Sequence, residues 1–279
     1  MQFSFYTRFQ EMAQQKGIEA AARYGVEHGF SSVEFLECFG AVPLLPDISA
    51  AKEAKAILAA HGLTTSCYSV GISVYQNPDA LSYLQKQVEL AAALGCPYLH
   101  HTLLLWLSPV PGMPSLTEGI DCAVEVAVGV ANYAKSLGVR CIYEDQGLFV
   151  NGVEGFGAFY SKLKQCCDNV GVCGDMGNTL FVDEAPADFF AAYADEICHV
   201  HVKDYRIRTC DHAPSSRWYR TRGGKWLRDT LVGDGGVDIA ACVRALQHYT
   251  GTYSLELCHP EPFDMGVEQA MAVLSAIER

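Results

Sequence analysis

Several common sequence signatures are missing from this 279-residue chain. None of its 12 cysteines forms a Cys-x-x-Cys pair, so we expect neither a zinc ribbon nor a thioredoxin-type redox pair. No apolar run approaches the roughly 20 residues that a membrane helix needs. The first residues also lack the basic start and cleavage site of a signal peptide. With cysteines scattered through apolar runs, as in a reduced core, these absences predict a cytoplasmic protein without a membrane partner.

Basic residues are few as well: 20 Lys and Arg stand against 32 Asp and Glu, a formal net charge of -12. Such an acidic chain is a poor candidate for binding nucleic-acid phosphates, so we expect no nucleic-acid partner. The length and the 50% hydrophobic content allow one large α/β core. We therefore predict a single domain over residues 1–279 that acts on a small molecule.

Short apolar runs alternate with longer segments of helical spacing along the whole chain. We predict eight strands at Phe3–Thr7, Ser32–Leu36, Thr65–Val70, Tyr98–Leu103, Arg140–Glu144, Val170–Asp175, Cys198–Lys203 and Tyr253–Leu257. We predict eight helices at Gln10–His28, Ile48–His61, Ala80–Leu94, Leu116–Leu137, Gly155–Gln165, Pro186–Tyr193, Asp238–Tyr249 and Gly266–Ile277. Eight β-α units indicate a (β/α)8 TIM barrel. A doubly wound sheet is the alternative, although no Gly-x-Gly-x-x-Gly follows the first strand.

The segment 204–237, after the seventh predicted strand, interrupts this rhythm. We expect a long loop there, and long structureless connections in compact domains usually have a function. It holds seven of the chain's 20 basic residues, including Arg206 and Arg208. One interpretation is a loop that folds over the barrel mouth and binds a phosphate or carboxylate through arginine. The other is a solvated lid or a contact with the acidic surface of a second subunit.

Four polar residues lie at the ends of the last four predicted strands: Glu144, Asp175, His201 and Glu256. Active sites of parallel α/β proteins form at these strand ends, so the four side chains are expected to converge. Three carboxylates and one imidazole suit Mn²⁺ or Mg²⁺ best, with Co²⁺ and Zn²⁺ also possible. Because side chains alternate along a strand, His199 shares the face of His201 and lies one layer deeper.

The segments around these residues resemble one known family. Tyr143–Asp145, Gly174–Asn178, His199–Asp204, Gly233–Asp238 and Ser254–Glu256 look like the signature segments of xylose isomerase-like TIM barrels. Within them the chain resembles the sugar phosphate isomerase/epimerase branch, which includes ketose 3-epimerases, hydroxypyruvate isomerase and inosose-processing enzymes. The resemblance implies that the matching Glu, Asp, His and Glu bind one divalent ion, most often Mn²⁺. It also implies that Glu144 and Glu256 shuttle a proton.

The chain departs from the ketose 3-epimerase pattern at two places. Those enzymes usually carry a His shortly after the aspartate of the sixth strand, where this chain has Met176-Gly177-Asn178. Their arginine six positions after the metal-binding His is replaced here by Ile207. We therefore transfer only a substrate contact to Asn178. Further candidate substrate-binding residues are Tyr6, Glu34, His101, His199, Lys203, Arg206 and Arg208.

The predicted chemistry is isomerisation or epimerisation of a sugar, a sugar phosphate or a sugar acid. The cation would stabilise an enediolate, and the two glutamates would remove and return the carbon-bound proton. An inosose dehydratase-like lyase, in which the same enediolate expels a hydroxyl group, is one alternative, and a non-catalytic sugar-binding barrel is another. The expected partners are a small sugar or hydroxy-keto substrate and, as in many members of this family, further copies in a homodimer or homotetramer.

Overall fold

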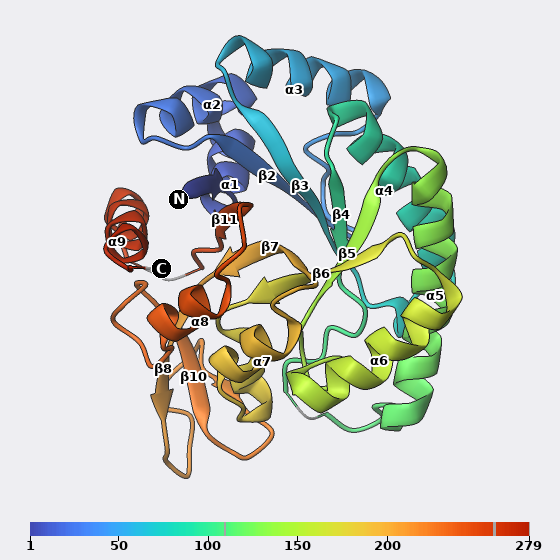
Figure 1. Cartoon of the computed structure of the whole chain (residues 1–279), viewed down its shortest axis with the longest axis vertical. Coiled ribbons are helices and arrows are strands. Elements are labelled where there is room, and N and C mark those ends of the chain that lie inside the picture. The colour runs from blue at the N-terminus through green and yellow to red at the C-terminus, as the bar shows by residue number, and fades with distance from the viewer. Residues whose placement is uncertain (109, 259–260, 279) are drawn as a thin grey trace.

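The structure is a computed structural model that describes residues 1–108, 110–258 and 261–278. Its strands close into a parallel barrel in the order β1-β11-β7-β6-β5-β4-β3-β2, with helices on the outside (Figure 1). The barrel strands are β1 (Gln2–Phe5), β2 (Ser32–Cys38), β3 (Thr64–Gly71), β4 (Tyr98–His101), β5 (Arg140–Glu144), β6 (Val170–Asp175), β7 (Ile197–Val202) and β11 (Thr252–Leu255). The predicted (β/α)8 barrel is confirmed, and the doubly wound alternative is wrong.

The described helices follow the predicted segments with one clear exception. They are α1 (Thr7–Lys16), α2 (Ile18–Glu27), α3 (Ile48–Ala60), α4 (Ala80–Leu94), α5 (Leu116–Ser136), α6 (Gly152–Cys166), α7 (Pro186–Tyr193), α8 (Ile239–Ala245) and α9 (Phe263–Ser275), with short 3-10 helices η1 (Val74–Gln76) and η2 (Asn178–Val182). The single helix predicted over 10–28 is wrong. Gly17 separates α1 from α2 because its φ of 88° lies outside the helical region.

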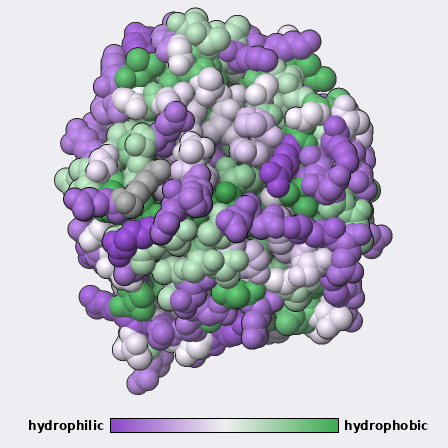
Figure 2. Space-filling model, viewed as in Figure 1, coloured by the Kyte–Doolittle hydropathy of each residue, from purple (hydrophilic) through white to green (hydrophobic). Residues whose placement is uncertain are grey.

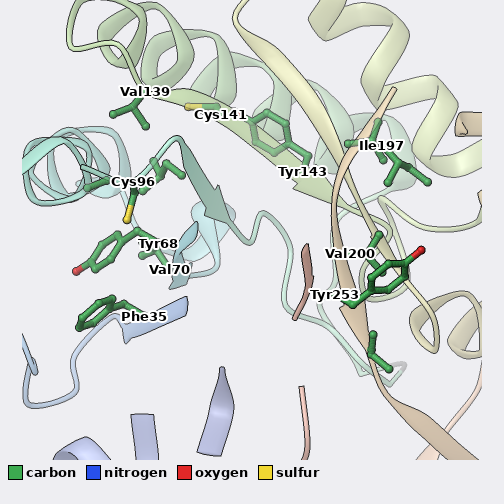
Figure 3. Packing of buried hydrophobic residues seen from close by; sticks show 14 of the residues in the cluster. Phe35, Tyr68, Val70, Cys96, Val139, Cys141, Tyr143, Ile197, Val200 and Tyr253 are labelled. Atoms are coloured by element: carbon green, nitrogen blue, oxygen red, sulfur yellow. The ribbon is translucent and has the colours of Figure 1, made fainter. Parts of the chain in front are cut away.

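The main apolar core lies between the barrel and the helices. Figure 3 shows Phe35, Tyr68, Tyr143 and Tyr253 projecting from their strands into this layer, and all four are at most 1% exposed. Strand alternation therefore turns the remaining side chains into the barrel. A small separate cluster of Cys67, Ile142 and Cys173 forms the apolar part of the interior. Most of the other inward positions are polar, as described below.

The segment 204–237 is not the structureless loop that the sequence predicted. It contains a three-stranded antiparallel sheet, which projects beside the barrel in Figure 1 and which we call the accessory sheet. Its strands are β8 (Asp204–Arg208), β9 (Tyr219–Arg220) and β10 (Trp226–Thr230), in the order β8-β10-β9. Asp204 anchors its base by accepting hydrogen bonds from the backbone N–H groups of Gly233, Gly235 and Val237.

The surface of the molecule mixes hydrophilic and apolar residues on the face shown in Figure 2. Among the residues that the structure describes, no helix has both the length and the apolar character that a membrane crossing requires.

Candidate metal centre

The four predicted ligands come together at one end of the barrel. Glu144 and Asp175 end β5 and β6, His201 lies near the end of β7, and Glu256 follows β11. These strands are neighbours in the barrel order β11-β7-β6-β5. Each residue offers one ligand atom, and these atoms all lie within 4.8 Å of one another. We call Glu144, Asp175, His201 and Glu256 the ligand quartet.

Within the quartet, the imidazole of His201 lies among the three carboxylates. Its Nδ1 atom is 3.1 Å from Oε2 of Glu144, 3.2 Å from Oε2 of Glu256 and 3.9 Å from Oδ2 of Asp175. The side chains of His201 and Asp175 are at most 1% exposed, whereas that of Glu256 is 20% exposed. Glu256 therefore marks the side of the quartet that solvent and a substrate reach.

Lys203 partly neutralises the quartet. Its Nζ atom lies 3.0 Å from Oδ2 of Asp175 and 2.8 Å from Oε1 of Glu256, and it also donates to Oδ1 of Asn178 at 3.3 Å. Lys203 thus shares the inward face of His201. Asn178 lies at the start of η2, where its backbone N–H donates to Asp175 Oδ1. Both residues are thus next to the quartet.

The electrostatics of the quartet follow from burial and from Lys203. Burial raises the pKa of Asp175 to about 7, although Lys203 opposes the shift. Burial would also raise the pKa of Glu256, but Lys203 and His201 lower it to about 2. For His201, burial is outweighed by Cys173, Glu34 and the hydrogen bond to Glu144, which raise its pKa well above the usual value. Without a metal ion, Asp175 and His201 therefore hold protons, and a bound metal ion would displace them.

The donor set fits a divalent cation. Three carboxylates packed this closely repel one another, and the single ammonium group of Lys203 offsets only part of that charge. Oδ1 of Asp175 accepts from the backbone N–H groups of Gly177 and Asn178, while its buried Oδ2 faces the quartet, 3.0 Å from Lys203 Nζ and 3.9 Å from His201 Nδ1. Mostly oxygen ligands with one imidazole are typical of sites for Mg²⁺, Mn²⁺ and related ions.

Glu34, a predicted substrate-binding residue, does not lie at the barrel mouth. The strand β2 continues to Cys38, which places Glu34 inside the barrel beneath the quartet with 0% exposure. There it contacts His199, whose Nε2 lies 2.7 Å from Glu34 Oε2. His199 is thus in the layer below His201, as predicted, and neither it nor Glu34 is placed to contact a substrate directly.

The histidine pair that ends β4 separates into an inward and an outward residue. His101 turns toward the helices, where its ring contacts Tyr143 edge-on at 5.0 Å and its Nδ1 hydrogen-bonds the carbonyl of Thr102. His100 turns inward instead, and its ring lies 5.4 Å from that of His201. The substrate contact predicted for His101 is therefore not supported by its position, and His100 is the residue of the pair that faces the quartet. Burial lowers the pKa of His100 to about 3, so this imidazole stays neutral.

Tyr6 also belongs to the site. Its ring stacks on that of His201, with centroids 5.0 Å apart and an interplanar angle of 26°. It lies just before α1 and is 4% exposed. Burial, together with the charges of Glu34 and Glu256, raises the pKa of its hydroxyl well above 10, so that it remains a hydrogen-bond donor.

The structure does not bring Arg206 and Arg208 to the quartet. In the accessory sheet, Arg206 pairs with Arg228 and Arg208 pairs with Trp226, so these residues share one face. That face is solvent-exposed at Arg206 and Arg208; Arg206 donates to Thr230, and Arg208 lies over the ring of Trp218. The substrate contacts predicted for both arginines are therefore not supported by their positions.

The opposite face of the accessory sheet packs toward the barrel. It carries Tyr205, Leu227 and Asp229, and Tyr205 and Leu227 cluster with Phe181 of η2. Burial raises the pKa of Asp229, and Lys203 acts against this shift. Asp229 was missed in the sequence because its strand was taken for a loop. The period-2 alternation of Tyr205-Arg206-Ile207-Arg208 could have revealed the hairpin.

Comparison with known proteins agrees with this architecture. Residues 19–277 match the family described as "Xylose isomerase-like TIM barrel", and the chain belongs to this family. No curated protein matches the sequence.

Three solved structures illustrate the likeness. The IolI protein with a bound zinc atom has a TM-score of 0.76 at 16% identity, with 99% of this chain and 98% of that chain covered. A xylose isomerase-like TIM barrel protein from Mycobacterium smegmatis in complex with magnesium has a TM-score of 0.73 at 19% identity, covering 99% and 96%. D-allulose 3-epimerase from Methylomonas sp. has a TM-score of 0.68 at 20% identity, covering 98% and 90%. At these identities the likeness demonstrates the fold alone.

Proposed function

We propose that this protein is a divalent-metal-dependent isomerase or epimerase of an uncharged polyhydroxylated carbonyl compound. The observation that carries the proposal is the ligand quartet, whose ligand atoms lie within 4.8 Å of one another on four neighbouring strands. The similarity to an epimerase and to zinc- and magnesium-bound barrels supports it. Within the site, Mn²⁺ suits the oxygen-rich donor set best.

Glu144, Asp175, His201 and Glu256 would hold the cation. When bound, it supplies Lewis-acid stabilisation of the negative charge that develops on a substrate carbonyl oxygen. The protein itself supplies the proton transfer. Lys203 keeps Glu256 ionised, so this carboxylate is ready to accept a carbon-bound proton on the exposed side of the quartet.

We assign the return of the proton to Glu144. Its Oε2 lies 3.1 Å from His201 Nδ1, the nitrogen that Glu256 also approaches at 3.2 Å, and its Oε1 is 3.5 Å from Nε2 of His100. Return of the proton to the same carbon inverts its configuration, whereas return to the neighbouring carbon exchanges an aldose for a ketose. Both reactions need the same two carboxylates, and product analysis separates them. A product lighter by one water would instead indicate the lyase alternative.

The accessory sheet supports a proposal about the charge of the substrate. Arg206 and Arg208 face solvent, whereas Asp229 lies on the face of the sheet that packs on Phe181 of η2. A carboxylate there accepts hydrogen bonds from substrate hydroxyl groups but repels a phosphate. We therefore propose a neutral sugar as the substrate, in place of the phosphate- or carboxylate-bearing sugar that the basic segment 204–237 suggested.

The test is metal-dependent exchange of a carbon-bound proton. The Mn²⁺-loaded protein is incubated with neutral ketoses in D₂O, and mass spectrometry measures deuterium in the recovered sugars. We expect exchange in the wild-type protein and a loss of about 10²–10⁴-fold in Glu144→Gln and Glu256→Gln. Glu37→Gln is the matched control, because Glu37 is a buried glutamate of β2 that lies in a separate pocket. Exchange that survives in both site variants would contradict the proposal.

A further inference from the structure

The interior of the barrel below the quartet holds a buried, multiply bonded carboxylate. Glu34 is 0% exposed and lies among four polar side chains. Its Oε1 accepts from Ser69 Oγ at 2.5 Å and lies 3.0 Å from His201 Nε2. Its Oε2 accepts from Ser254 Oγ at 2.5 Å and lies 2.7 Å from His199 Nε2. Barrel interiors of this kind are usually filled by branched apolar residues, so this network is a departure that requires a reason.

The network surrounds both oxygens of Glu34 with hydrogen-bond partners. Burial of a carboxylate is costly unless hydrogen bonds and positive charge compensate it. Here donors from three strands surround both oxygens: β3 provides Ser69, β7 provides the two histidines, and β11 provides Ser254. Each oxygen accepts from one serine hydroxyl and also lies within 3.0 Å of one histidine nitrogen, which is the arrangement of a carboxylate that accepts hydrogen bonds at both oxygens. An ionised carboxylate can only accept hydrogen bonds.

This constraint determines which nitrogen of His201 carries a proton. Since Glu34 only accepts, the Nε2 atom of His201 must be the N–H that donates to it. In the neutral ring, the lone pair then lies on Nδ1, which is the atom that faces Glu144 and Glu256. Tyr6 stacks on the ring and restricts its rotation. The ring is thus fixed both in tautomer and in orientation.

We propose that Glu34 is a positioning residue that presents His201 Nδ1 to the metal ion. This inference rests on the proposed metal site and deepens it, because it assigns a role to a residue that contacts neither metal nor substrate. The partners that orient metal-binding histidines commonly contribute about 10–100-fold to metal affinity. Glutamine at position 34 would keep the size of the side chain but lose the charge, and its amide group could donate to Nε2.

The experiment compares Mn²⁺ and Zn²⁺ affinities of the wild-type protein, Glu34→Gln and the control Glu37→Gln by isothermal calorimetry. We expect a 10–100-fold loss of affinity in Glu34→Gln. The control should bind within about twofold of wild type, since Glu37 lies on the same strand but in a separate pocket. Thermal unfolding of each metal-free protein is measured in parallel. A lower unfolding temperature with unchanged affinity would mean that Glu34 only stabilises the barrel, and this would overturn the inference.

A second measurement uses the wild-type protein alone and does not depend on folding of the variant. Long-range ¹H–¹⁵N correlation spectra of the Zn²⁺-loaded protein should show His201 protonated at Nε2 and metal-bound at Nδ1. The reverse assignment would refute the role of Glu34 while leaving the metal site intact. Failure of the wild-type protein to bind either ion would instead refute the proposed function itself, so the two failures are distinguishable.

Discussion

Nζ of Lys203 lies 2.8 Å from Oε1 of Glu256, and we expect this ion pair to couple the stability of the barrel mouth to metal binding. Replacement of Lys203 by methionine removes the ammonium group that pairs with Glu256 and Asp175. We expect the metal-free protein to lose about 3–5 kcal/mol of folding free energy, as is typical when one partner of a buried ion pair is removed. Chemical denaturation measures this loss. Saturating Mn²⁺ should restore most of this free energy. A loss that Mn²⁺ does not reduce would contradict the claim that Lys203 and the metal ion neutralise the same carboxylates.

Metal affinity should rise with pH. In the metal-free protein, burial raises the pKa of Asp175 to about 7, and the pKa of His201 is raised well above 6.5 by its acidic neighbours despite burial. Both groups must lose their protons before they can bind a metal. We expect more protons to be released per ion at pH 6 than at pH 8, because Asp175 is mostly protonated at pH 6 and mostly ionised at pH 8. Calorimetry in buffers of different ionisation enthalpy counts them. Equal release at both pH values would argue against Asp175 as a ligand.

The two faces of the accessory sheet should differ in their effects on catalysis. Arg206→Ala and Arg208→Ala change the exposed face, so KM for a neutral sugar should stay within about twofold of the wild-type value. Asp229→Asn changes the opposite face, which packs on Phe181. If Asp229 accepts a substrate hydroxyl, kcat/KM falls by about 10–100-fold. Steady-state kinetics with phosphorylated and unphosphorylated forms of one sugar provides the comparison. A strong preference for the phosphate that disappears in the arginine variants would reverse this assignment.

His101 should contribute to instability in acid. Burial lowers its pKa to about 4, whereas the unfolded chain titrates near 6.5. The folded state therefore binds fewer protons between these values, and stability falls as the pH drops from about 6.5 through 4. The loss should reach about 3 kcal/mol, and it should be absent in His101→Gln. Urea unfolding from pH 4 to pH 8 measures the slope. The exposed His248→Gln should retain the wild-type slope, and a wild-type slope in His101→Gln would be contrary to expectation.

The sequence predicted the barrel and the quartet because both depend on local patterns. Strand alternation alone placed His199 and His201 on the same face, and polar residues at successive strand ends indicated where the side chains meet. The depth of Glu34 was missed because the strand β2 continues past its apolar run to Cys38. At the end of β4 the pattern could not tell which of His100 and His101 points inward.

The accessory sheet was missed for a different reason. Its many arginines suggested a solvated loop, although alternate residues of β8 and β10 pack on Phe181. Charge composition shows which residues a segment contains, but only the pairing of its strands decides which of them face the site. The hypothesis of an anionic substrate depended on that unknown pairing.

Anomalous diffraction from crystals of this protein soaked in Mn²⁺ tests the metal centre most directly. We predict one strong peak about 2.0–2.3 Å from a carboxylate oxygen of each of Glu144, Asp175 and Glu256 and from Nδ1 of His201. A well-ordered quartet without a peak at millimolar Mn²⁺, or a peak that lies next to other residues only, would contradict the proposed metal centre.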